Sequence, residues 1–124
     1  MAPPTNFLVQ GDPRRAFDAA LAALADQGFR FGPEATPFVV QAERGSKSQT
    51  ALLGAFAGKK GQHFVVTVRA VAHPSGHTVI SLEPGTIGAL AGAIGVARAN
   101  EAYGHFAAAV QYRLHVGQVL LRVV

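Results

Sequence analysis

Histidine is the residue type in this sequence with the clearest capacity for chemistry. His73 and His77 flank Pro-Ser-Gly, a segment typical of a turn, and His63 lies in the run that precedes it. Neutral imidazole binds zinc, copper and nickel, so histidines at the mouth of a hairpin are candidate metal ligands. The chain has no cysteine, however, and no carboxylate lies near these histidines in the sequence. We therefore expect two solvated turn histidines and no metal site.

The patterns that catalysis and cofactor binding require are also missing. Gly54 and Gly58 enclose three residues, whereas a P-loop has four, and Lys60 stands where a P-loop has Ser or Thr. Neither the dinucleotide-binding pattern G-x-G-x-x-G nor the nucleophile pattern G-x-S-x-G occurs. Nothing in the sequence pairs the two late carboxylates, Glu83 and Glu101, for acid–base work. The sequence thus predicts a protein that is not an enzyme and has no catalytic residue and no cofactor.

The most unusual segment is apolar and rich in glycine. Residues 84–97 contain no Asp, Glu, Lys or Arg, and their glycines recur every three or four positions. This spacing would place the glycines on one face of a helix, where they let backbones approach closely. The run is too short to span a bilayer, which takes roughly 18–20 apolar residues. We interpret it either as a loop or first helical turn packed tightly against the sheet, or as an apolar surface for another subunit, a lipid surface or an apolar ligand. The candidate ligand or interface residues are Gly85, Gly88, Leu90, Gly92, Ile94, Gly95 and Arg98.

The positive charge of the chain is concentrated in its later part. The formal net charge is +4, and all three lysines, Lys47, Lys59 and Lys60, lie between Gly45 and Gly61. This basic patch could contact phosphates of lipid or nucleic acid, or it could keep two turns soluble. Nucleic-acid binding through these lysines would be nonspecific and sensitive to salt. Most of the eight Phe lie in apolar runs typical of a core, which disfavours stacking on single strands.

Periodicity along the 124 residues predicts one α+β domain that spans residues 1–124. We expect strands over 6–10, 38–43, 62–72 and 77–83, and helices over 13–27 and 100–120. Residues 48–58 fit a strand or a short helix, and we favour a strand because Gly54 would cost a helix about 1 kcal/mol. The fold class is a two-layer sandwich, an antiparallel sheet of four to five strands covered by an N-terminal helix and a long C-terminal helix. This order of elements resembles a reduced helix-grip arrangement, in which a cavity can open between the long helix and the sheet.

These patterns predict a small non-catalytic binding or assembly module. We expect a homo-oligomer with an apolar site between the long helix and the sheet, bordered by residues 85–98, for a lipid-like molecule or an anionic membrane surface. A nonspecific nucleic-acid-binding domain is the first alternative. A small enzyme with a cavity lined by His63, Arg69 or Glu83 is the second. The N-terminus Met-Ala-Pro-Pro-Thr-Asn lacks the features of a secretory signal, so we expect a cytoplasmic protein, free or peripheral to the membrane.

Overall fold

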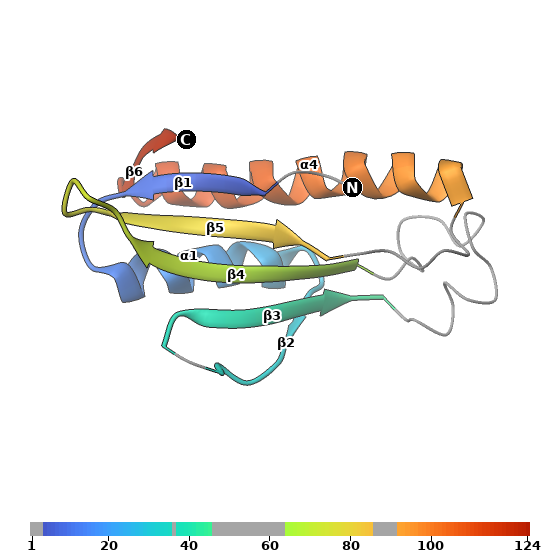
Figure 1. Ribbon diagram of the computed structural model, residues 1–124, viewed down its shortest axis with the longest axis horizontal. Helices are drawn as coiled ribbons and strands as arrows, with labels where there is room; N and C mark the ends of the chain where they lie inside the picture. The colour runs from blue at the N-terminus through green and yellow to red at the C-terminus, as the bar shows by residue number, and fades with distance from the viewer. Residues whose placement is uncertain (1–3, 36, 46–63, 86–91) are drawn as a thin grey trace.

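In the residues that the structure describes, an open antiparallel sheet of six strands packs against two helices (Figure 1). The computed structural model describes residues 4–35, 37–45, 64–85 and 92–124, and of residues 92–100 it describes the backbone alone. Along the sheet the strand order is β2-β3-β4-β5-β1-β6. The elements are β1 (Thr5–Val9), α1 (Pro13–Asp26), β2 (Arg30–Phe31), β3 (Val39–Arg44), β4 (Phe64–Ala72), β5 (Thr78–Pro84), α4 (Gly92–Val116) and β6 (Leu120–Val123). The predicted α+β class is confirmed.

Local chemistry explains where α1 begins and ends. The Asp12 carboxylate accepts a hydrogen bond from the Arg14 backbone N–H at 3.0 Å, and Pro13 occupies the first helical position, where no N–H is needed. Gly28, with φ +92°, follows the helix in a conformation that side chains disfavour. The predicted helix over 13–27 is therefore confirmed to within one residue. Its buried face consists of Ala16, Phe17, Ala20, Ala23 and Leu24.

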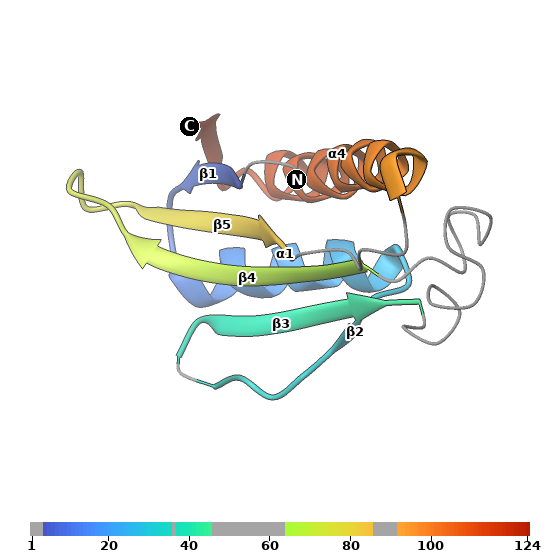
Figure 2. The ribbon, with the colours of Figure 1, turned by 45° about the vertical axis from the view of Figure 1, so that its right-hand side comes forward.

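Alternation along the strands separates the face of the sheet that the two described helices cover from the opposite face. Both helices lie on one side of the sheet (Figures 1 and 2), and α1 contacts α4, β4 and β5. The register aligns Val40 with Val68 and Val68 with Leu82, which builds one continuous apolar surface beneath the helices. The buried strand residues on this face are Phe7, Val9, Val40, Ala42, Phe64, Val66, Val68, Ile80 and Leu82.

The C-terminal third of the chain differs from the expectation. The predicted helix over 100–120 is wrong at both ends, because α4 runs from Gly92 to Val116 and residues Leu120–Val123 form β6 on the free edge of β1. The helix stops at Gly117 and Gln118, and Gln118 adopts a positive φ of 61° that reverses the chain. With β6 and the two-residue β2, the sheet has six strands where four to five were expected. Residues 48–58, for which a strand was favoured over a short helix, lie outside the described residues.

An aromatic cluster fills the space between α4 and the sheet. The Phe106 ring makes edge-to-face contacts with Phe29 at 4.8 Å and with Phe64 at 5.4 Å between centroids. Tyr103 joins the same cluster, with its ring centroid 5.6 Å from that of Phe64. Such contacts each add about 0.5–1.5 kcal/mol beyond the burial of their area. Beside Tyr103 and Phe106, these rings therefore occupy the space between α4 and the sheet.

We expect Phe64→Ala to lower the free energy of unfolding by about 3–5 kcal/mol, because it removes a fully buried ring and leaves a void. Phe31→Ala is the matched control, since the Phe31 side chain is exposed at the sheet edge and its loss should cost much less. Urea denaturation followed by circular dichroism measures both. Equal losses in the two variants would contradict this packing.

A second cluster holds the turn between β2 and β3. Phe38 has a positive φ of 66°, a strained conformation for an aromatic residue, and its ring packs edge-on against Phe17 at 5.7 Å. The Arg14 guanidinium lies 4.6 Å from the Phe38 ring centroid and donates two hydrogen bonds to the Glu34 carboxylate, at 2.9 and 3.0 Å. The Glu34 carboxylate also accepts the Phe38 N–H. Together these contacts keep the strained turn against α1.

The Arg14 hydrogen bonds lower the pKa of Glu34 from its ordinary value, whereas the Arg14 pKa is raised. A carboxyl with a depressed folded-state pKa stabilises the fold above its ordinary pKa and loses that contribution as the pH falls through the folded-state value. We therefore expect the urea midpoint of the wild type to fall more steeply between about pH 6 and pH 3 than that of Glu34→Gln. Parallel curves would show that Glu34 contributes nothing to acid sensitivity.

Candidate binding surface

Two connections are attached at the same end of the sheet. β3 ends where β4 begins, because Arg44 and Phe64 are cross-strand partners, and Pro84 at the end of β5 pairs with Val66. Residues 46–63 and 86–91 are therefore attached at neighbouring points, and the N-terminal end of α4 lies at the same end of the molecule (Figures 1 and 2). We call this end the connection end. The opposite end carries the tight turn that joins β4 to β5 and includes His73 and His77.

A junction of three segments closes the sheet at the connection end. The Val65 carbonyl accepts the Gly85 N–H at 2.7 Å and the Tyr103 hydroxyl at 3.0 Å. The Val65 N–H in turn donates to the Tyr103 hydroxyl oxygen at 3.4 Å. Burial raises the pKa of Tyr103, and the hydrogen bond with Val65 partly offsets this shift. Tyr103 thus fixes α4 to β4 beside the point where the chain leaves β5.

Gly85 has a packing reason to be glycine. A Cβ atom built on Gly85 would lie 3.0 Å from the Val65 Cβ and 3.2 Å from the Val65 carbonyl oxygen. At these distances Val65 must move by a few tenths of an ångström to admit a side chain at residue 85. The predicted candidate Gly85 therefore occupies a position where two backbones approach closely, which is one of the two roles expected for the glycine-rich segment.

The described strands carry two arginines at the connection end. Arg30 donates to the Glu43 carboxylate at 3.3 Å and to the Gly45 carbonyl at 3.0 Å. The Arg44 guanidinium lies 5.5 Å from the Phe106 ring centroid, and its Nε is the nearest atom to a Cβ built on Gly28. Arg44 therefore covers the edge of the aromatic cluster beside the C-terminal end of α1.

The remaining predicted site residues divide into two groups. The first turns of α4, where the backbone alone is described, contain Gly92, Ile94, Gly95 and Arg98. The second group lies outside the described residues and consists of Gly88, Leu90, Lys47, Lys59 and Lys60. The structure thus brings the attachment points of the glycine-rich segment and the basic patch to one end of the molecule.

The residues considered for metal binding and catalysis are arranged as solvent-facing pairs. His73 Nδ1 lies 2.7 Å from the Ser75 hydroxyl within the turn, so this ring stabilises the turn. Arg69 and Glu83 form an ion pair at 3.1 Å on the face of the sheet opposite the helices, where both side chains are about two-fifths exposed. His63 lies outside the described residues. Within the described ranges, no group of three or more His, Cys, Asp or Glu is placed to hold a metal ion.

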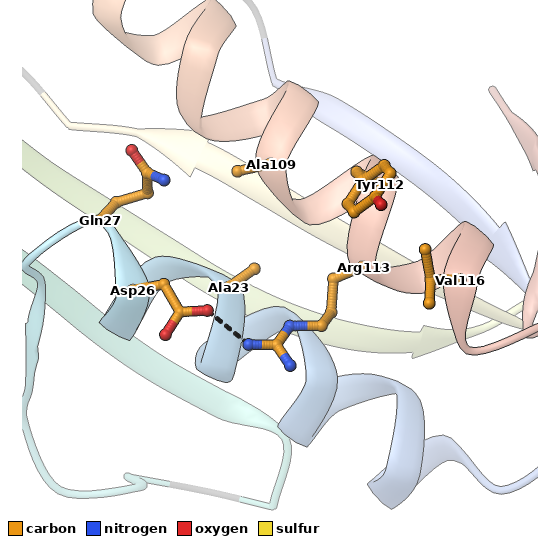
Figure 3. Close-up of a pocket in the computed structure, with 7 residues that line it drawn as sticks. All are labelled: Ala23, Asp26, Gln27, Ala109, Tyr112, Arg113 and Val116. Atoms are coloured by element: carbon orange, nitrogen blue, oxygen red, sulfur yellow. Dashed lines mark hydrogen bonds and ion pairs between the residues drawn. The ribbon is translucent and has the colours of Figure 1, made fainter.

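The sequence interpretation missed an exposed surface on the outer side of α4. The Tyr112 side chain is 71% exposed and that of Val116 is 59% exposed. Tyr112 separates two shallow grooves of about 310 and 400 Å³, and the first lies between α1 and α4 beside the Asp26–Arg113 ion pair (Figure 3). The signal in the sequence was that Tyr112 and Val116 fall outside the apolar stripe of their helix.

Among the helices that the structure describes, none is long and apolar enough to cross a membrane.

A comparison with models of known protein families found no match, and a comparison with curated proteins found none either.

Two glycines provide a test of the junction. We expect Gly85→Ala to lower the melting temperature, because the added methyl collides with Val65. Gly104→Ala should raise stability by about 0.5–1 kcal/mol, because Gly104 lies within α4 and a Cβ there meets open space. Differential scanning calorimetry measures both variants. A tolerated Gly85→Ala would show that Gly85 is not required for close packing.

Proposed function

We propose that this protein is a non-catalytic, self-associating binding module that takes an apolar ligand with an anionic headgroup at the connection end. Such a group could belong to a free lipid-like molecule or to a membrane surface. The observation that carries the proposal is the convergence of the attachment points of the glycine-rich segment and the basic connection. Arg44 pairs with Phe64, and the Gly85 N–H bonds to the Val65 carbonyl, so the attachment points of the two segments lie on neighbouring strands.

The composition of the two connections supports this chemistry. Residues 46–63 include Lys47, Lys59 and Lys60 and no acidic residue, together with the apolar run Ala-Leu-Leu-Gly-Ala-Phe-Ala. Residues 86–91 are uncharged. A lysine close to an anionic membrane contributes about 1 kcal/mol, and apolar side chains beside it add burial in the interface. Because both connections start from one end of the sheet, we propose that their lysines and apolar side chains act on one ligand.

The described aromatic residues favour this proposal over nucleic-acid binding. A single-strand binder needs exposed rings beside its cations. Phe7, Phe17, Phe29, Phe64 and Phe106 are instead buried in the core. Of the exposed rings among the described residues, Tyr112 at 71% lies in the C-terminal half of α4, away from the connection end, and Phe31 at 39% is a single ring beside Arg30 on β2.

We expect the protein to sediment with vesicles that contain phosphatidylglycerol and to leave neutral phosphatidylcholine vesicles in the supernatant. The double variant Lys59→Gln/Lys60→Gln should bind anionic vesicles about 30-fold more weakly, since two lysines contribute about 2 kcal/mol. Arg15→Gln/Arg122→Gln is the matched control, because it removes the same charge from exposed residues on α1 and β6. Its vesicle binding should change little.

Native mass spectrometry of the purified protein distinguishes the two sources of the ligand. A retained small molecule indicates a free lipid-like ligand, whereas vesicle binding without a retained molecule indicates a membrane surface. The proposal is wrong if neither is found, or if both double variants weaken vesicle binding equally. Salt-sensitive binding to duplex DNA without vesicle binding would favour the nucleic-acid alternative.

A further inference from the structure

The outer face of α4 is lined by exposed residues at positions that suit a helix pair. Seven exposed residues, spaced three and four apart, lie along one side of the helix. They are Glu101, Gly104, His105, Ala108, Gln111, Tyr112 and His115. Ala108 lies at the centre of this set, both along the helix and around it. We call these seven residues the outer α4 face.

We infer that the outer α4 face binds the same face of a second copy, with the two helices antiparallel about a two-fold axis beside Ala108. This inference rests on the self-association included in the proposed function and is independent of the ligand. A two-fold contact requires a surface that is complementary to itself. The outer α4 face meets that requirement in shape and in charge.

Tyr112 is the exposed aromatic side chain of the outer α4 face. In an antiparallel pair centred on Ala108, Tyr112 of one copy lies over the hole between Glu101, Gly104, His105 and Ala108 of the other, as a knob fits into a hole. Two sides of this hole are glycine and alanine, and a Cβ built on Gly104 meets no atom within 4 Å. The hole therefore has room for the ring of Tyr112, which is 71% exposed in the single chain. Small residues at the crossing also allow the axes to approach to roughly 8 Å.

Side chains at the two ends of the outer α4 face select the register of the pair. The same pairing brings His115 of one copy to the level of Glu101 of the other, so an imidazole N–H can donate to the carboxylate at each end of the contact. A shift of one helical turn that centres the contact beyond Ala108 would instead place His105 opposite His115 and Tyr112 opposite Ala108. The alternative register thus loses both the carboxylate partner and the open hole at Gly104.

The size of the surface sets the strength of the contact. From Glu101 to His115 the face is about 21 Å long, at 1.5 Å per residue. One helix face of this length buries less than the roughly 800 Å² per partner of a standard interface. We therefore expect a reversible dimer that dissociates in the micromolar range.

Cysteine cross-linking tests the register directly, because the native chain has no cysteine. In Ala108→Cys the two thiols meet at the two-fold axis, so mild oxidation should convert most of the protein to a covalent dimer. His115→Cys is the control on the same face. Its two thiols would lie about 21 Å apart along the paired helices, beyond the 4.4–6.8 Å between Cα atoms that a disulfide allows. Equal cross-linking of the two variants would overturn the inference.

Gly104→Gln separates association from folding. Glutamine is a better helix former than glycine, so the variant should unfold at a higher temperature. Its side chain also fills the hole for Tyr112, so sedimentation velocity should show at least tenfold weaker dimerisation, and Tyr112→Ala should give a similar loss. A dimer that both variants leave unchanged would show that the protein associates through another surface. A monomer at every concentration would overturn self-association while leaving the vesicle experiment to decide the ligand.

Discussion

The edge-to-face packing of Phe106 against Phe29 and Phe64 is the contact on which the rest of the structure depends. It joins α4 to the segment that follows α1 and to the first residue of β4, so three distant parts of the chain meet in one cluster. Aromatic rings of this kind combine a large buried area with a preferred geometry. Because the cluster occupies the space under α4, the covered face of the sheet is a core along the described strands. The binding surfaces that we propose therefore lie at the connection end and on the outer surface of α4.

The Val65 carbonyl extends the same constraint to the connection end. It accepts hydrogen bonds from Gly85 and from Tyr103, so β4, the end of β5 and α4 are held at one point beside the cluster. Desolvation of a carbonyl at such a junction is tolerated because both of its lone pairs are used. The two connections are therefore attached beside a well-ordered junction, and their composition is the basis of the ligand chemistry that we propose.

The sequence allowed most of the fold to be predicted, because most of it follows from local rules. Asp12 and Pro13 mark the start of α1, and alternation from Phe64 to Val68 identifies the covered face of β4. β6 could not be separated from the preceding helix, because Leu120 continues the apolar spacing of that helix. Only the pairing of β6 with β1 makes these residues a strand. The sequence identified the two segments of the candidate site but not that their attachment points lie at one end of the sheet. The proximity of their attachment points depends on the long-range register between Arg44 and Phe64, which no local pattern encodes.

The two proposed surfaces constrain one another. The connection end lies at the N-terminal end of α4, whereas the contact centred on Ala108 involves the C-terminal part of the same helix. An antiparallel pair would therefore point its two connection ends in opposite directions. Such a dimer cannot place both connection ends on one flat membrane, so pairing would add no avidity there. It would bridge two membranes, or hold one lipid-like molecule at each end. Within this geometry, self-association is compatible with independent binding of a free ligand, and it favours a monomer on a single membrane surface.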